Sequence, residues 1–186
     1  MIYKIERGSF KMENKVLIVV DMQNDFIDGA LGTKEAQAIV PNVKKKIEEY
    51  RRMGGKIIYT YDTHTKDYLY THEGKNLPVP HCINGSDGWQ IPAEIAPKDG
   101  DAHAYKICFG HNRWSAAEYG LQDYDSFELI GLCTDICVVS NALILRSMYP
   151  EKDIFVDASC CAGVTPEKHA AALEVMKSCQ INVIGE

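Results

Sequence analysis

Short apolar runs alternate with longer amphipathic segments from residue 15 to the end of the chain. The runs are rich in β-branched residues, which is typical of strands buried on both faces of a sheet. They predict six strands, at residues 16–20, 56–61, 103–107, 127–132, 153–158 and 181–185. Apolar residues at helical spacing predict helices at 34–53, 137–149 and 166–179, and a short helix at 115–120.

Strands that alternate with helices predict a single α/β domain. The expected architecture is Rossmann-like, with three αβα layers and a six-stranded, mostly parallel sheet. The domain is expected to span residues 15–186, and residues 1–14, which are mixed in character, are expected to form an N-terminal arm. In such sheets ligands bind beyond the carboxyl ends of the strands, near the point where strand order reverses. The residues that follow each strand are therefore the first candidates for function.

Composition excludes several classes of protein. The chain has 186 residues, with 20 Lys and Arg against 26 Asp and Glu, which gives a net charge of −6. Broad nucleic-acid or anionic-membrane binding needs a basic surface, so neither partner is expected. No apolar stretch reaches the about 18 residues of a membrane span, and no signal-peptide core precedes Asp21. This predicts a cytoplasmic protein whose seven cysteines are thiols.

Chemically useful side chains stand where four of the predicted strands end. Asp21 follows the first strand, Lys106 lies near the end of the third, and Cys137 opens the helix after the fourth. A thiol at a helix N-terminus, with a nearby cation to lower its pKa and a carboxylate to accept its proton, predicts a cysteine nucleophile. The alternative is that Cys137 is a small buried residue and Asp21 a cap.

A second group follows the second strand. Asp62 and His64 form an Asp-x-His pair, and His81 returns 17 residues later in a Pro-rich segment. Such a set can bind Zn²⁺, with Fe²⁺ or Mn²⁺ as alternatives. His72 and Cys82 are competing ligands, and three unrelated polar residues in one long loop remain the simpler interpretation by spacing alone. Neither glycine-rich nucleotide fingerprint is present, which argues against a dinucleotide or nucleoside-triphosphate site.

Taken together, these motifs resemble the isochorismatase-like cysteine hydrolases, and most closely their nicotinamidase/pyrazinamidase branch. The resemblance covers VVDMQNDF (19–26), the DTH and PHC segments between 62 and 82, Lys106, and GLCTDICV (131–138). It implies the isochorismatase-like hydrolase fold for residues 15–186 and a cysteine amidohydrolase that deamidates a small aromatic amide, most simply nicotinamide, through a thioester.

The same resemblance assigns roles to individual residues. The implied catalytic triad is Asp21, Lys106 and Cys137. Cys133, after a cis Leu132–Cys133 peptide, would join Cys137 in forming an oxyanion hole through the two backbone N–H groups. The remaining implied residues are the metal ligands Asp62, His64 and His81 and the substrate-pocket residues Phe26 and Leu132.

Some positions depart from the nicotinamidase pattern and leave the substrate open. Tyr68 stands where some members have another His, Pro78 replaces a pocket aromatic residue, and the segment after Lys106 is unusual. Trp89 or Trp114 is a candidate to replace the missing ring. The alternatives are an amidase or ureido/carbamoyl hydrolase of the same superfamily acting on a non-aromatic substrate, an ether hydrolase of the isochorismatase type, and a non-enzymatic binding protein. A homo-oligomer is expected, since dimers and tetramers are common in the superfamily.

Overall fold

A six-stranded sheet forms the centre of the molecule in the computed structural model, which describes residues 14–186. The predicted N-terminal arm therefore lies outside the described residues, apart from Asn14. Every strand pairing is parallel, where mostly parallel was expected, and the strand order is β3-β2-β1-β4-β5-β6. The strands are β1 (Lys15–Val20), β2 (Lys56–Asp62), β3 (Ala102–Lys106), β4 (Ser126–Leu132), β5 (Asp153–Ala162) and β6 (Asn182–Ile184).

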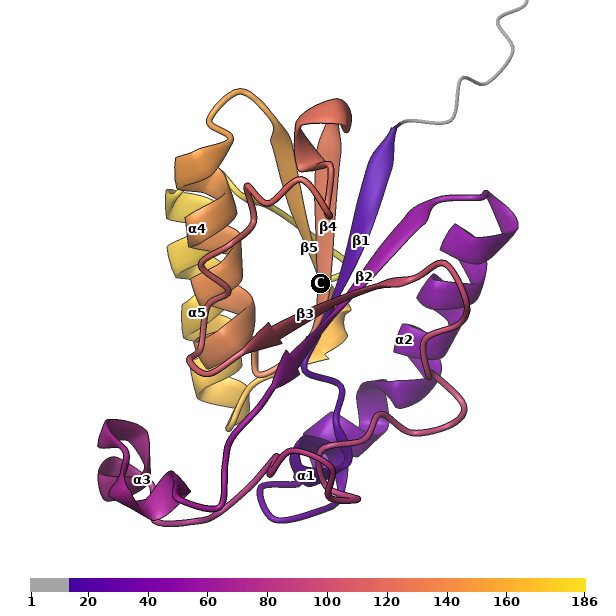
Figure 1. Ribbon diagram of the computed structural model, residues 1–186. Coiled ribbons are helices and arrows are strands. Elements are labelled where there is room, and N and C mark those ends of the chain that lie inside the picture. The colour runs from indigo at the N-terminus through magenta and orange to yellow at the C-terminus, as the bar shows by residue number, and fades with distance from the viewer. Residues whose placement is uncertain (1–13) are drawn as a thin grey trace, which may run out of the picture.

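Helices cover both faces of the sheet, which confirms the three-layer prediction. Helix α2 (Lys34–Arg52) lies on one face, and α4 (Val139–Met148) and α5 (Pro166–Ser178) lie on the other (Figure 1). The alternation of side chains along β1 divides the core in two: Leu17 and Val19 pack toward α2, whereas Ile18 and its neighbours pack toward α4 and α5. Because order reverses between β1 and β4, a site is expected at the carboxyl ends of these two strands.

The predicted elements differ from the observed ones mainly at boundaries and in irregular segments. Residues 115–120 form turns instead of a helix, because Trp114 and Tyr119 at the two ends are drawn into the core. The helix predicted from 137 begins earlier, as a π-helical turn over Thr134–Val138 that continues into α4. Sequence patterning missed four short helical elements, α1 (Asn24–Ile27), η1 (Tyr68–Tyr70), α3 (His72–Asn76) and η2 (Leu121–Asp123).

Strand β5 runs four residues beyond its predicted end, and Gly131 allows β4 to stay paired with this extension. The β4–β5 register shifts between Leu129 and Gly131. Gly131 has a φ of +117°, and a Cβ there would lie 2.1 Å from the Val20 carbonyl oxygen, so only glycine fits. The shift lets β4 remain paired up to Leu132, immediately before the turn that carries Cys137.

A buried polar network fixes α2 to the sheet on the face opposite α4. The Tyr50 hydroxyl donates to Glu128 Oε2 at 2.6 Å, and Lys46 Nζ lies 2.7 Å from Glu128 Oε1 and 2.9 Å from Asp157 Oδ2. Each buried carboxylate thus has a cationic partner, as burial of charge requires. The network supports the fold at a distance from the strand ends considered next.

Candidate active site

The side chains of Asp21, Lys106 and Cys137 meet at the carboxyl edge of the sheet, as the sequence predicts. Lys106 Nζ lies 2.7 Å from Asp21 Oδ2 and 3.5 Å from Cys137 Sγ. It also donates to Asp62 Oδ1 at 3.2 Å, so one ammonium group joins the predicted triad to the predicted metal ligands. All four residues are buried. Because these groups are shielded from water, each charge is stabilised by the neighbouring side chains instead of by solvent.

Asp21 is held in place by Thr60, a residue that sequence reasoning missed. The Asp21 N–H donates to Thr60 Oγ1 at 3.1 Å, and the same hydroxyl donates to Asp21 Oδ1 at 2.5 Å. Asp21 has a left-handed backbone with φ of 47°, just after β1. One carboxylate oxygen is thereby fixed and the other is left for Lys106 and the thiol. A Thr within the apolar run that predicts β2 was the available signal.

Cys137 lies in the π-helical turn that leaves β4. The predicted cis peptide between Leu132 and Cys133 is present. The Cys133 carbonyl accepts hydrogen bonds from the N–H groups of Ile136 and Val138, at 3.0 and 3.1 Å, which closes the turn. This places the Cys133 and Cys137 backbones on one tight turn beside the Cys137 thiol.

The electrostatics of the thiol differ from the sequence expectation. Burial raises the pKa of Cys137 well above its ordinary value; the nearby Lys106 ammonium opposes this, while Asp21 and Asp62 add to it. Burial also raises the pKa of Asp21 against the lowering effect of Lys106. For Lys106 burial acts to lower the pKa, but the carboxylates and the thiol outweigh it and raise it. Burial of the thiol thus acts against the lowered pKa that the helix-terminus argument favoured.

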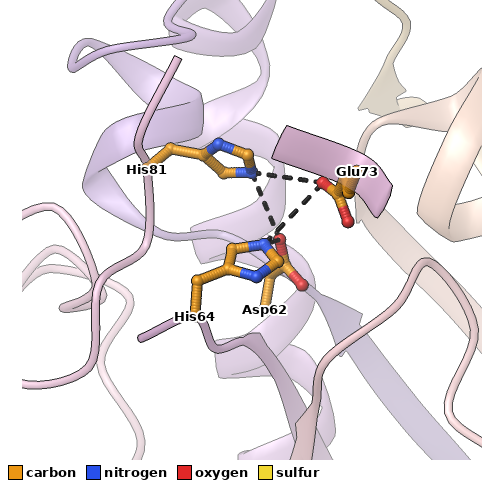
Figure 2. Close-up of side chains that lie close together, drawn as sticks. All are labelled: Asp62, His64, Glu73 and His81. Carbon is orange, nitrogen blue, oxygen red and sulfur yellow. Dashed lines mark hydrogen bonds and ion pairs between the residues drawn. The ribbon is translucent and has the colours of Figure 1, made fainter. Parts of the chain in front are cut away.

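The predicted metal ligands Asp62, His64 and His81 converge, and a fourth residue joins them. Figure 2 shows their side chains pointing toward one centre together with Glu73. His64 Nε2 lies 2.9 Å and His81 Nε2 3.4 Å from Asp62 Oδ2, and each lies 3.7 Å from Glu73 Oε1. The four ligand atoms are all within 4.8 Å of one another.

Backbone pairing explains why the two histidines meet across 17 residues. His64 and Ile83 form a parallel bridge, in which the His64 N–H donates to the Cys82 carbonyl at 3.0 Å. Asp25 reinforces the return, since its Oδ2 accepts from the Cys82 N–H at 2.7 Å. Cys82 therefore contributes backbone, not a ligand, and His72 is exposed on α3; neither competing candidate belongs to the group.

The donor set suits a divalent transition ion. His81 Nδ1 lies 2.8 Å from the Val79 carbonyl, which can only accept, so Nδ1 carries the proton and Nε2 presents a lone pair to the centre. Burial would raise the pKa of Asp62, but hydrogen bonds with His64 and His81 and the charge of Lys106 lower it, which keeps the carboxylate ionised. Two imidazole nitrogens and two carboxylate oxygens match the ligands that Zn²⁺, Fe²⁺ or Mn²⁺ take.

Replacing Glu73 with Gln is expected to weaken Zn²⁺ binding at least tenfold, because the uncharged amide replaces one of two anionic donors. The measurement is a competition titration against a chromophoric chelator. His72→Ala is the matched control, since this neighbour on α3 is exposed and outside the group. Equal affinities for wild type and Glu73→Gln would remove Glu73 from the ligand set.

Glu73 was missed because no strand positions it. It lies on α3, a five-residue helix inside the long irregular segment after β2. Thr71 caps this helix by accepting from the Gly74 N–H at 3.0 Å, and a Thr followed two residues later by an acidic residue was the available signal. The direction in which α3 presents Glu73 depends on the path of the whole irregular segment after β2, so it could not be predicted from local sequence.

A cavity of about 290 Å³ opens beside Cys137. Phe26 and Leu132 line it, as the resemblance implied, and Asp62 and His81 form part of its wall. Its other lining residues are mostly apolar: Leu31, Ala36, Leu77, Ile136 and Val164, with Thr33, Glu73, Phe109, Cys133, Gly163 and Lys168. Small-molecule sites span roughly 300–1,000 Å³, so this cavity favours a small substrate.

The second aromatic ring of the cavity comes from Phe109, and not from Trp89 or Trp114. Trp89 donates through Nε1 to Thr63 Oγ1 at 3.0 Å and stacks on Tyr105, outside the cavity lining. Trp114 is fully buried in the core. The expected replacement ring is therefore present, but on a different residue, in the segment after Lys106 that departs from the usual nicotinamidase pattern.

Residues 15–185 match the sequence signature described as the Isochorismatase domain. The chain belongs to the isochorismatase family. Among relatives, it is 25% identical to the nicotinamidase of Schizosaccharomyces pombe, over 91% of this chain and 92% of that protein. It is 30% identical to a probable inactive nicotinamidase of Arabidopsis thaliana, over 90% of each chain.

Solved structures of the isochorismatase-family type share the fold. The pyrazinamidase of Pyrococcus horikoshii in complex with zinc superposes with a TM-score of 0.80 at 25% identity, covering 93% of this chain and 99% of that one. The N-carbamoylsarcosine amidase of Thermoplasma acidophilum gives a TM-score of 0.76 at 28% identity, with 92% and 95% covered. The α/β isochorismatase-like fold is thus confirmed. In the part of the chain that the structure describes, no helix combines the length and apolar character needed to cross a bilayer.

Proposed function

We propose that this isochorismatase-family hydrolase is a cysteine amidohydrolase that deamidates a small aromatic amide, with nicotinamide the leading candidate. One observation carries the proposal: Lys106 contacts Asp21, Cys137 and Asp62 at once, and Cys137 and Asp62 line an apolar cavity. The nucleophile thus faces the same small space as three members of the group suited to a divalent ion, Asp62, Glu73 and His81, while Lys106 links it to the base Asp21. Likeness to nicotinamidases at modest identity supports the same assignment.

The proposed reaction begins with proton transfer. Asp21, which shares the Lys106 ammonium with the thiol, takes the thiol proton as Cys137 Sγ attacks the carboxamide carbon. Lys106 stays protonated and balances the charge of the carboxylates. The N–H groups of Cys133 and Cys137 stabilise the oxyanion, and one such donor contributes about 3 kcal/mol in comparable sites.

Collapse of the tetrahedral adduct breaks the C–N bond and forms a thioester. Asp21 returns the proton to the departing nitrogen, which leaves as ammonia. Water then attacks the thioester, Asp21 accepts its proton, and Cys137 is released as a thiol with the carboxylic acid product. A bound Zn²⁺, or Fe²⁺ or Mn²⁺ in its place, would supply Lewis acidity toward the ring nitrogen of the substrate.

A ureido or carbamoyl hydrolase acting on a non-aromatic substrate is the second candidate. Structural likeness to an N-carbamoylsarcosine amidase favours it, and it would need the triad without the ring-binding metal. A non-enzymatic role is the third, and the relative described as probably inactive makes it worth testing. A non-enzymatic role would leave the buried contact of Asp21, Lys106 and Cys137 unexplained.

A panel of amides and ureido acids, assayed for ammonia with and without a chelator, separates these candidates. The proposal expects nicotinamide among the best substrates, with turnover reduced by the chelator and restored by added Zn²⁺. A faster ureido acid and indifference to chelator would support the second candidate. Absence of turnover across the panel for the metal-loaded protein would support a non-enzymatic role.

A further inference from the structure

The fully buried side chain of Asn141 joins two segments of the candidate site. It lies on α4, four residues after Cys137. Its Nδ2 donates to the Cys137 carbonyl at 2.8 Å and to the Phe109 carbonyl at 3.2 Å. Its Oδ1 accepts from the His111 N–H at 2.9 Å and from Trp114 Nε1 at 3.1 Å. A carboxamide has two donor hydrogens and two acceptor lone pairs, so these bonds use its full capacity.

Three of the four bonds hold the segment that follows Lys106. This segment, residues 107–114, has no helix or strand of its own. It carries Phe109, whose ring lines the cavity although the residue is 43% exposed. An irregular segment with an exposed aromatic residue needs contacts elsewhere to keep one position. Asn141 supplies them from the helix that begins at the nucleophile.

Gly110 shows how closely the same segment sits on α4. A Cβ at Gly110 would lie 2.4 Å from Ile144 Cδ1, whereas the next contact, with Ser140 Cβ, is an ordinary 3.5 Å. The backbone next to Phe109 therefore approaches the helix as far as the Ile144 side chain permits. Close packing and the Asn141 amide fix the same loop independently.

We propose that Asn141 is a positioning residue that fixes the Phe109 wall of the cavity relative to Cys137. The four hydrogen bonds of Asn141, called the clamp below, set the distance between the Phe109 wall and Cys137 Sγ. That distance determines how a planar ring fits against the nucleophile. The statement about the ring rests on the proposed function. Displacement of about 1 Å at a reacting centre can cost about 100-fold in rate, so loss of the clamp should be visible in kinetics.

The decisive variants disturb the clamp in two unrelated ways. Asn141→Leu keeps the approximate volume and removes all four bonds. Gly110→Ala leaves Asn141 intact and crowds the loop against the flexible end of the Ile144 side chain. The double variant Gly110→Ala/Ile144→Val removes the conflicting Cδ1 atom and should reseat the loop. Tyr50→Phe is the matched control, because it removes a buried 2.6 Å hydrogen bond on the opposite face of the sheet.

Two readouts are measured well below the lowest melting temperature of the set. The first is kcat and KM for the best aromatic amide. The second, independent of turnover, is the ratio of Cys137 alkylation rates by N-benzyl-chloroacetamide and by chloroacetamide, with the adduct located by peptide mapping. We expect Asn141→Leu to lower kcat/KM and the alkylation ratio at least tenfold, and Gly110→Ala to lower both to a smaller extent. The double variant should return within threefold of wild type, and Tyr50→Phe should stay within twofold.

Two outcomes would overturn the inference. One is an Asn141→Leu protein with a lower melting temperature but with kinetic constants and an alkylation ratio like those of Tyr50→Phe. Such a result would show that Asn141 has a structural role alone. The other is a loss in Gly110→Ala that the double variant does not recover, since loop displacement would then not explain that loss. If no amide is turned over by any variant but the alkylation ratio changes as expected, the proposed function fails and the positioning role of Asn141 stands.

Discussion

Replacing Cys137 with Ala is expected to reduce ammonia release from the best amide by about 10⁵-fold or more, the scale found when a covalent nucleophile is removed. The thiol lies 3.5 Å from Lys106 Nζ and borders the cavity, and no other group at this position can form the thioester. Stability should change little, because Ala and Cys are similar in size. The measurement is a coupled ammonia assay under single- and multiple-turnover conditions.

Cys108→Ala is the control for this experiment. Cys108 is an exposed thiol two residues after Lys106, so it reports any effect of thiol chemistry near the site without touching the triad. It should retain activity within about twofold. Wild-type turnover by Cys137→Ala would rule out the covalent mechanism, whatever the substrate.

Replacing Lys106 with Met is expected to have the next largest effect, on stability as well as on activity. The ammonium lies 2.7 Å from Asp21 and 3.2 Å from Asp62, and its loss leaves two buried carboxylates without this partner. Removing one partner of a buried ion pair typically costs about 3–5 kcal/mol of unfolding free energy. Activity should fall by about 10³-fold, within the range ascribed to acid–base groups. Urea unfolding and the ammonia assay measure the two effects.

The double variant Asp21→Asn/Lys106→Met tests the electrostatic reason for that loss. Asparagine removes one of the two stranded charges, so part of the lost stability should return while the protein remains inactive. Additive destabilisation in the double variant would contradict the coupling that the contact distances imply. Full activity in Lys106→Met would remove Lys106 from the mechanism.

Parallel strands made much of the site predictable. Asp21, Asp62 and Lys106 each stand at or just after the end of an apolar run, and parallel strands place such positions along one edge. The position of Cys137 followed from the same rule for β4. The direction of its pKa shift did not, because burial raises the pKa against the effect of the nearby cation, and burial depth depends on the whole fold.

The residues that sequence analysis missed belong to irregular segments or act through tertiary contacts. Glu73 reaches the metal group only because α3 is folded back beside His81, and Phe109 reaches the cavity because Asn141 and Gly110 seat its loop on α4. No local period encodes such paths. The failed prediction of a helix at 115–120 has the same origin, since burial of Trp114 and Tyr119 overrides local helix propensity.

The place of β3 at the edge of the sheet has a consequence for how the site comes apart. β3 pairs with β2 alone, so it has one ladder of hydrogen bonds where the inner strands have two. Edge elements of this kind open locally at lower free energy than the molecule as a whole. Detachment of β3 carries Lys106 away from two buried carboxylates, which then repel each other. An edge strand therefore carries the charge on which the catalytic edge depends, and its fraying would disarm the site while the rest of the fold remains intact.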